Sequence, residues 1–194
     1  MPCPVRRCPG CRPCRVLVGR DRGRDRLARA LADGRAGHGG ALVIRGEAGM
    51  GKTGLLDRLA RDAREPDVRI VRGTGFETEG ELPFGGLHLL VHPFTDRFDA
   101  LPAQQAAALR SAFGAGRDPV HDRFLIGAAI LTLLSEPAAE RPLLCLVGDV
   151  QWPDRAWADA PVFAACRIGA ADPLLMVFAV RDRPGRSPSP GSRR

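Results

Sequence analysis

Apolar residues occur along the chain in two alternating patterns. Short runs rich in Val, Leu and Ile are typical of strands buried on both faces of a parallel sheet, and four such runs cover residues 41–45, 68–72, 143–147 and 174–180. Longer segments repeat apolar residues every three or four positions, which predicts amphipathic helices over residues 53–64, 103–113, 120–134 and 155–167. Strands that alternate with helices predict parallel β-α-β units with right-handed crossovers. The expected fold class is therefore α/β, with helices flanking a parallel sheet.

The remaining segments are expected to be shorter helices, loops and unpacked ends. Leu27, Ala30 and Leu31 predict a short helix before the first strand. A loop rich in Gly and Glu is expected over residues 73–86, followed by a brief apolar stretch at 87–91. Both ends combine Pro and Arg with Cys, Ser or Gly, a composition that packs poorly. The expected organisation is a leader at 1–15, one domain at 16–183 and a tail at 184–194.

Length and composition indicate one globular domain. The chain has 194 residues and is 44% hydrophobic, which suits a single sizeable core. No apolar run approaches the roughly 18 to 20 residues that cross a bilayer. Prolines and cysteines stand where a signal peptide has its apolar segment, so the expected location is cytoplasmic.

The net charge of +7 comes from the two ends of the chain. Residues 1–29 carry nine Arg and two Asp, and residues 181–194 carry five Arg and one Asp. Residues 30–180 carry 15 basic and 19 acidic residues. A DNA-binding domain clusters basic residues on a folded face beside a reading element, and neither feature is found. Direct DNA binding is therefore not expected.

Four of the six cysteines lie in the first 14 residues, at Cys3, Cys8, Cys11 and Cys14. Structural zinc sites pair two cysteine knuckles across a longer loop. An iron–sulfur run would need its next cysteine where Val18 stands. The spacing therefore favours a leader without a metal over a metal site.

Residues 46–53 read Gly-Glu-Ala-Gly-Met-Gly-Lys-Thr and fit the phosphate-binding pattern G-x-x-x-x-G-K-[ST] at every fixed position. The glycines let backbone N–H groups point at phosphate oxygens, and the following helix directs its N-terminus at the same charge. Lys52 is expected to neutralise phosphate oxygens and Thr53 to hold Mg²⁺. Lys52 is also the single lysine among 29 basic residues, at a position where a compact ammonium fits and a planar guanidinium does not. The expected nucleotide-binding residues of this loop are Gly46, Glu47, Ala48, Gly49, Met50, Gly51, Lys52 and Thr53.

The second half of such a site is an acidic residue at the end of another buried strand. Asp149 follows the strand at 143–147 and is the candidate both for holding Mg²⁺ and for activating water. The alternative for Asp149 is a cap on the turn before Pro153. Arg181 ends the strand at 174–180 and is the candidate for reaching the γ-phosphate, with plain solvent surface as the alternative.

Four motifs, in order, carry a resemblance to a known family. They are Leu17-Val-Gly-Arg-Asp21, Gly46–Thr53, Glu79-Gly-Glu-Leu-Pro-Phe-Gly-Gly-Leu-His88 and Leu143–Trp152. Together they resemble the ATPase domain of the large ATP-binding LuxR-type transcription regulators, which are signal-transduction ATPases of the AAA-like class. The resemblance covers about residues 16–183 and implies ATP and Mg²⁺ as ligands. It also implies an adenine-side role for Val18, Gly19 and Arg20, for which an ordinary turn is the alternative.

The chain departs from this family at the end of the strand at 143–147. The family usually reads Asp-Asp-x-Gln-Trp there, whereas this chain reads Gly148-Asp149-Val150-Gln151-Trp152. Gly148 thus stands where the Mg²⁺-holding Asp would be, and Asp149 where the catalytic carboxylate would be. Pro153 replaces the usual Leu. The resemblance therefore implies ATP binding with weak or absent hydrolysis.

The same resemblance implies a longer protein and a fifth strand. The family continues through a winged-helix lid and helical repeats to a C-terminal helix-turn-helix, so this chain resembles a truncated module. Its strand order, 5-1-4-3-2, places the fifth strand after Arg181, where Pro, Ser and Gly are expected to prevent one. The strand at 41–45 would then be an exposed edge. Self-association, weakened by ATP, is expected on that ground.

Three functional interpretations follow. The first is an ATP-binding switch domain of a LuxR-type regulator with little hydrolysis. The second is a non-catalytic nucleotide-binding module that acts on full-length relatives. The third is a small P-loop kinase, which needs an acceptor pocket and a basic lid that residues 150–180 show little of.

Overall fold

The computed structural model describes residues 15–17, 20–63, 67–74, 84–114, 122–150 and 155–181. Within these ranges only the course of the backbone is described for residues 15–17, 20–22, 149–150 and 155–158. Among the described residues, no helix combines the length and the apolar character that a bilayer crossing requires.

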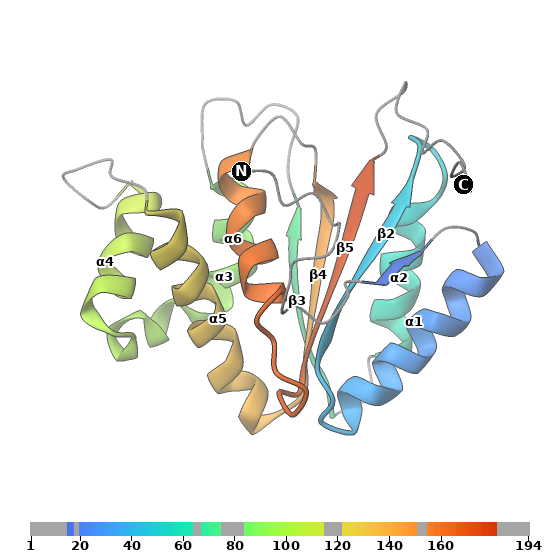
Figure 1. Cartoon of the computed structure of the whole chain (residues 1–194), viewed down its shortest axis with the longest axis horizontal. Helices are drawn as coiled ribbons and strands as arrows, with labels where there is room; N and C mark the ends of the chain where they lie inside the picture. Colours follow the sequence, from blue (N-terminus) through green and yellow to red (C-terminus); the bar gives the residue numbers. More distant parts are fainter. Residues whose placement is uncertain are drawn as a thin grey trace, which may run out of the picture.

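The centre of the molecule is a parallel sheet of five strands in the order β1-β2-β5-β4-β3 (Figure 1). Its strands are β1 (Arg15–Leu17), β2 (Gly40–Gly46), β3 (Arg69–Thr74), β4 (Leu143–Val150) and β5 (Leu174–Arg181). The predicted α/β fold class is confirmed, and β2 to β5 are the four strands expected from the apolar runs. Their relative order also agrees with the order that the family resemblance implied.

The predicted exposed edge at residues 41–45 is wrong. Strand β1 pairs with β2, with Val16 opposite Val43 and Leu17 opposite Ile44, while β5 pairs with the other side of β2. The fifth strand therefore comes from the segment before the P-loop strand. Three residues, Arg-Val-Leu, were too short a run to stand out from the expected leader. The edge argument for self-association no longer holds.

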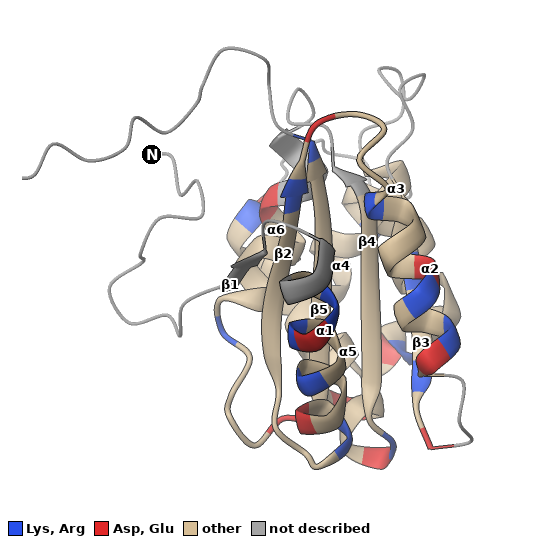
Figure 2. Cartoon of the chain, turned by 90° about the vertical axis from the view of Figure 1, so that its right-hand side faces the viewer, with Lys and Arg blue, Asp and Glu red and all other residues tan. Residues whose placement is uncertain are grey.

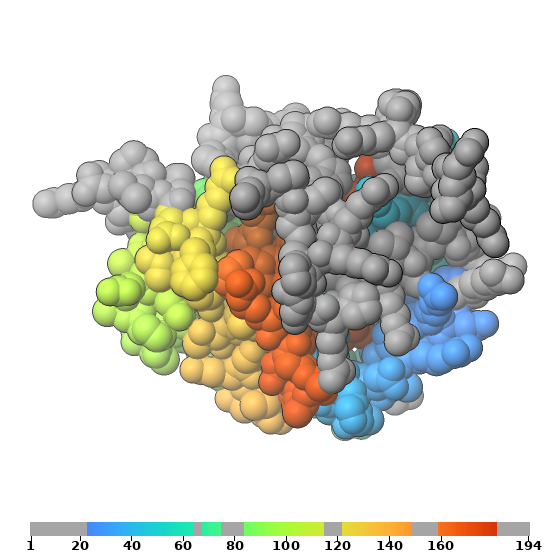
Figure 3. Space-filling model, viewed as in Figure 1, coloured from blue at the N-terminus to red at the C-terminus, as the bar shows by residue number. Residues whose placement is uncertain are grey.

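Helices lie on both faces of the sheet (Figure 1). One face carries α1 (Arg20–Arg35) and α2 (Lys52–Asp62). The other carries α3 (Gly85–Val91), the 3₁₀ segment η2 (His92–Ala100), α4 (Ala103–Ala112), α5 (Arg123–Glu140) and α6 (Arg155–Ala165). In the space-filling view α4, α5 and α6 adjoin in one continuous surface (Figure 3).

Alternating residues of the strands divide the core into two layers. Leu144 and Leu146 of β4 pack with Leu56 and Leu59 of α2 on one face of the sheet. The residues between them, such as Cys145, belong to the larger layer that α3 to α6 cover. Because the strands are buried on both faces, their apolar runs are continuous, which is why the sequence revealed them.

Two helical segments differ from the sequence-based expectation. The apolar stretch 87–91 is part of helix α3, which packs on β3 at Gly73, and residues 92–100 continue as η2 with Phe94 and Phe98 buried. Helix α5 begins after Asp122, whose carboxylate accepts hydrogen bonds from the N–H groups of Phe124 and Leu125. This cap defines the start of α5 three residues later than predicted.

Candidate nucleotide-binding site

The P-loop connects the carboxyl end of β2 to the first turn of α2. Gly46 is the last residue of β2 and Lys52 is the first residue of α2. Gly49 and Gly51 have φ angles of 76° and 77°, a left-handed conformation that costs residues with a Cβ roughly 1–2 kcal/mol. These two glycines therefore allow the tight turn that returns the chain to the sheet.

Lys52 lies beneath this loop. Its side chain is only 9% exposed, and its Nζ donates hydrogen bonds to the carbonyl oxygens of Gly46 at 2.9 Å and Glu47 at 2.7 Å. An ammonium group has three donors, and the third has no acceptor among the residues that the structure describes, so it can serve a ligand. The two bonds hold the charge at the mouth of the loop, where an anion would enter.

The N-terminus of α2 adds partial positive charge at the same place. The first described helical bond joins the N–H of Leu55 to the carbonyl of Gly51 at 3.1 Å. Helix geometry leaves the preceding amides, those of Lys52, Thr53 and Gly54, without an acceptor inside the helix. The first turn contains no acidic residue, and the side chain of Thr53 is exposed. An ammonium group and free helix amides of this kind can bind phosphate, and the Thr53 hydroxyl is the group of this loop that could hold Mg²⁺.

The carboxyl end of β4 lies at the same edge of the sheet as this loop, separated from β2 by β5, and Gly148 is the residue of this end that faces α2. Gly148 follows Leu144 and Leu146 on the α2 side of the sheet, and a Cβ at position 148 would lie 3.7 Å from Leu56 Cδ1 and 3.7 Å from Thr74 Oγ1. The register between β4 and β5 shifts between Val147 and Val150, which places a bulge at this point. Position 148, where the resemblance implied a Mg²⁺-holding Asp, therefore contributes no oxygen from a side chain.

The structure describes some of the other predicted site residues fully, some only by their backbone and some not at all. Arg181 is opposite Gly46 in the pairing of β5 with β2 and is exposed, so it lies at the edge where the P-loop begins. The backbone of Asp149 belongs to β4, and Arg20 is the first residue of α1, but the side chains of both lie outside the described residues. Val18 and Gly19 lie outside the described residues altogether.

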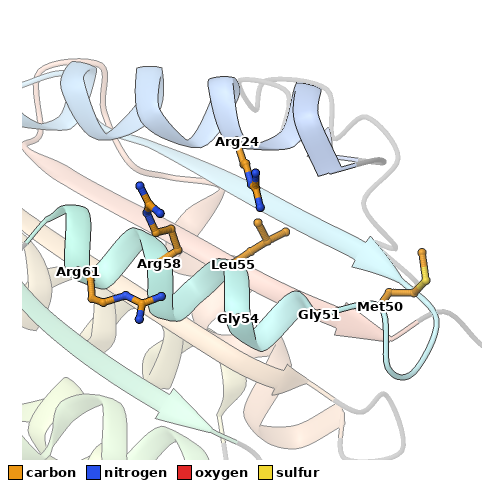
Figure 4. Close-up of a pocket in the computed structure, with 7 residues that line it drawn as sticks. All are labelled: Arg24, Met50, Gly51, Gly54, Leu55, Arg58 and Arg61. Carbon is orange, nitrogen blue, oxygen red and sulfur yellow. The ribbon is translucent and has the colours of Figure 1, made fainter.

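A hollow of about 280 Å³ opens between α1 and α2, next to the P-loop (Figure 4). Arg24 reaches toward it from α1, and Arg58 reaches toward α1 from α2. Its lining residues are Arg24, Met50, Gly51, Gly54, Leu55, Arg58 and Arg61. We call this the α1–α2 hollow. It extends the anion-binding end of the loop along the outer side of α2.

A family model for the AAA ATPase domain matches residues 16–177. The chain belongs to the AAA ATPase domain family. The match begins in β1 and ends inside β5, so it contains β2, β3 and β4 in full, parts of β1 and β5, and the whole P-loop. No curated protein matches the chain. Nucleotide binding is thus a property of the family to which this AAA ATPase domain belongs.

Sequence reasoning found the loop of this AAA ATPase domain but missed the hollow beside it. Gly54, Arg58 and Arg61 are spaced four and three residues apart, so a helix over 53–64 places them on one side. That spacing was a usable signal. The sequence carries no such signal for Arg24, because its place in the lining depends on how α1 packs against α2.

The cysteines add no chemistry to the described site. Cys145 is fully buried in the sheet, and this burial raises its pKa well above the ordinary range, which keeps the thiol protonated and unreactive. No group of three or more potential metal ligands occurs among the described residues. Cys3, Cys8, Cys11 and Cys14 lie outside them.

Proposed function

We propose that this AAA ATPase domain binds ATP with Mg²⁺ at the P-loop and serves as a nucleotide-dependent switch with weak or absent hydrolysis. The observation that carries the proposal is the buried Lys52, whose ammonium is held by the carbonyls of Gly46 and Glu47 at the end of β2. A buried cation with a free donor, next to open helix amides, suits a polyphosphate.

Each residue of the loop has a defined task in this proposal. Lys52 would donate to oxygens of the β- and γ-phosphates, while the amides of residues 48–53 would surround them. The hydroxyl of Thr53 would hold Mg²⁺, which bridges the phosphates and neutralises charge. Arg181 would approach the γ-phosphate from β5, and Val18, Gly19 and Arg20 would lie on the adenine side.

Weak hydrolysis is supported by Gly148. Rapid hydrolysis needs one carboxylate that holds Mg²⁺ and another that activates water. Gly148 offers none from the position that faces α2, which leaves Asp149 as the single candidate at the end of β4. Binding and release, rather than fast turnover, would then control the state of the domain.

The four motifs in the order of the LuxR-type regulators support a role in transcription regulation in the cytoplasm, through other proteins and without direct contact with DNA. A second candidate, a non-catalytic nucleotide-binding module that acts on full-length relatives, is favoured by the same glycine. The two differ in whether bound ATP is ever hydrolysed. Single-turnover measurement with γ-labelled ATP separates them, because the module releases no phosphate.

Titration with ATP, with and without Mg²⁺, tests the proposal. A ligand at a hundred times its dissociation constant stabilises the fold by about 2.7 kcal/mol, which for this size corresponds to a rise in melting temperature of roughly 5–10 °C. We expect that rise and a turnover well below about 1 s⁻¹. No change in melting temperature at millimolar ATP would contradict nucleotide binding, and a turnover of about 1 s⁻¹ or more would contradict the weak-hydrolysis part.

A further inference from the structure

The α1–α2 hollow carries more positive charge than the base and ribose of ATP require. Three of its seven lining residues are arginines: Arg24, Arg58 and Arg61. Arg24 and Arg61 have no ion-pair partner among the residues that the structure describes, and only the Nε of Arg58 is bonded to the carboxylate of Asp62. Figure 2 shows basic residues interspersed with acidic ones along α1 and α2. Two guanidinium groups without an ion-pair partner among the described residues, beside a third that is paired with Asp62, point to an anionic ligand group.

The hollow is continuous with the P-loop. Gly51 and Gly54 belong to its lining and also to the turn that presents the helix amides. A Cβ on Gly54 would meet no atom within 4 Å, so the surface there is open. Leu55 supplies apolar surface between the loop and Arg24, and Met50 adds apolar surface at the loop itself (Figure 4). A single ligand can therefore extend from the loop over an apolar surface to the guanidinium groups.

We propose that the α1–α2 hollow binds a phosphate group carried on the ribose 2′ or 3′ oxygen of the bound nucleotide. The inference rests on the proposed function, because the 5′ phosphates of the same nucleotide occupy the P-loop. Guanidinium groups bind phosphate in a bidentate manner, and Arg58 and Arg24 approach the hollow from opposite helices. The volume of about 280 Å³ is near the lower end of the roughly 300–1,000 Å³ of small-molecule sites, which suits a nucleoside with one phosphate better than a peptide segment.

The test compares ADP with its 2′- and 3′-phosphorylated forms by isothermal titration calorimetry on the full chain. An exposed ion pair contributes about 1.5- to fivefold in affinity, so three arginines predict binding about tenfold tighter for at least one phosphorylated form. The variants Arg24→Ala and Arg61→Ala should each reduce that advantage, measured against ADP in the same variant, about two- to fivefold. Arg29→Ala is the matched control, since Arg29 is exposed on the same helix and does not line the hollow.

Each outcome has a separate meaning. Equal affinity for all three nucleotides overturns the inference and leaves the proposed function intact. An advantage that survives in both Arg24→Ala and Arg61→Ala overturns the location. An acidic peptide, such as deca-glutamate, that binds in an Arg24-dependent way without any nucleotide preference would show a peptide site and also overturn it. Failure of ADP and both phosphorylated forms to bind contradicts the proposed function, and the inference falls with it.

Discussion

The carboxyl ends of β2 and β4 lie at the same edge of the sheet, separated by β5, and their residues differ in the chemistry that they offer. At the end of β2 every fixed position of the phosphate-binding pattern is present, and Lys52 is buried and bonded to the loop that it serves. At the end of β4 a glycine, Gly148, stands on the face that packs against α2, and the pairing with β5 is interrupted by a bulge. In the proposed function the first end binds a polyphosphate, and the second, without a carboxylate at position 148, contributes little to its hydrolysis.

The contrast teaches that binding and hydrolysis are separate properties of this fold. Binding depends on backbone amides, glycine conformations and one ammonium group, all within residues 46–54. Hydrolysis depends on carboxylates that come from a different strand. A substitution at one end can therefore change one property and leave the other intact, and the variants below exploit that separation.

The largest effect is expected from Lys52→Ala. It removes charge-assisted hydrogen bonds of about 1.5–3 kcal/mol, which corresponds to a ten- to hundredfold loss of ATP affinity. Lys52→Arg should lower the ATP affinity by a similar factor, because a planar guanidinium does not fit where Nζ lies between two carbonyls. Arg29→Ala is the control with unchanged affinity. Calorimetric titration measures all three, and parental affinity in Lys52→Ala would refute the P-loop assignment.

Gly148→Asp tests the end of β4 and should raise the rate of ATP hydrolysis. The new Cβ would lie in ordinary contact with Leu56 and Thr74, at 3.7 Å from each, so the fold can accept it. A carboxylate there would hold Mg²⁺, and we expect turnover to rise about tenfold or more, which is about 1.4 kcal/mol in the barrier. Gly148→Asn is the matched variant without the charge. Equal rates in both variants, measured by phosphate release, would show that the missing carboxylate is not what limits hydrolysis.

The sequence predicted the parts of the fold in which one local pattern decides the outcome. The continuous apolar runs of β2, β4 and β5 and the glycine pattern of the P-loop are of this kind. Strand β1 was missed because three residues form a strand only when β2 offers a partner. Helix α3 was missed because seven residues, Gly85–Val91, are too few to show a helical period.

The same distinction applies to the site. Lys52 and Thr53 follow from the motif, since its spacing fixes their chemistry. The α1–α2 hollow does not, because Arg24 meets Arg58 only after two helices pack side by side. The environment of Gly148 likewise needed the structure, since alternation along β4 decides which face it occupies.

Gly73→Ala should destabilise the packing of α3 on β3, the strand next to β4, without changing the P-loop. A Cβ at Gly73 would lie 2.8 Å from the carbonyl oxygen of Gly86 and 3.1 Å from Leu90 Cβ, so α3 must move away from β3. Overpacking of this kind costs about 1–3 kcal/mol. Urea unfolding should show that loss of stability. The ATP affinity, measured at urea concentrations below the unfolding transition, should stay at the parental value. A parallel fall in affinity would mean that the two ends are coupled through the sheet.

The smallest effects come from a matched pair of glycines at the P-loop end. Gly51 has a φ of 77°, so Gly51→Ala should destabilise the fold by about 1–2 kcal/mol. Gly54 lies inside α2 with open space where its Cβ would be, so Gly54→Ala should stabilise the helix by about 0.5–1 kcal/mol. Equilibrium unfolding measures both signs. If ATP affinity falls only in Gly51→Ala, the left-handed turn itself is what presents the amides to the phosphates. If it falls equally in both, the added methyl group obstructs the ligand, and steric access at the mouth of the α1–α2 hollow, rather than loop conformation, limits binding.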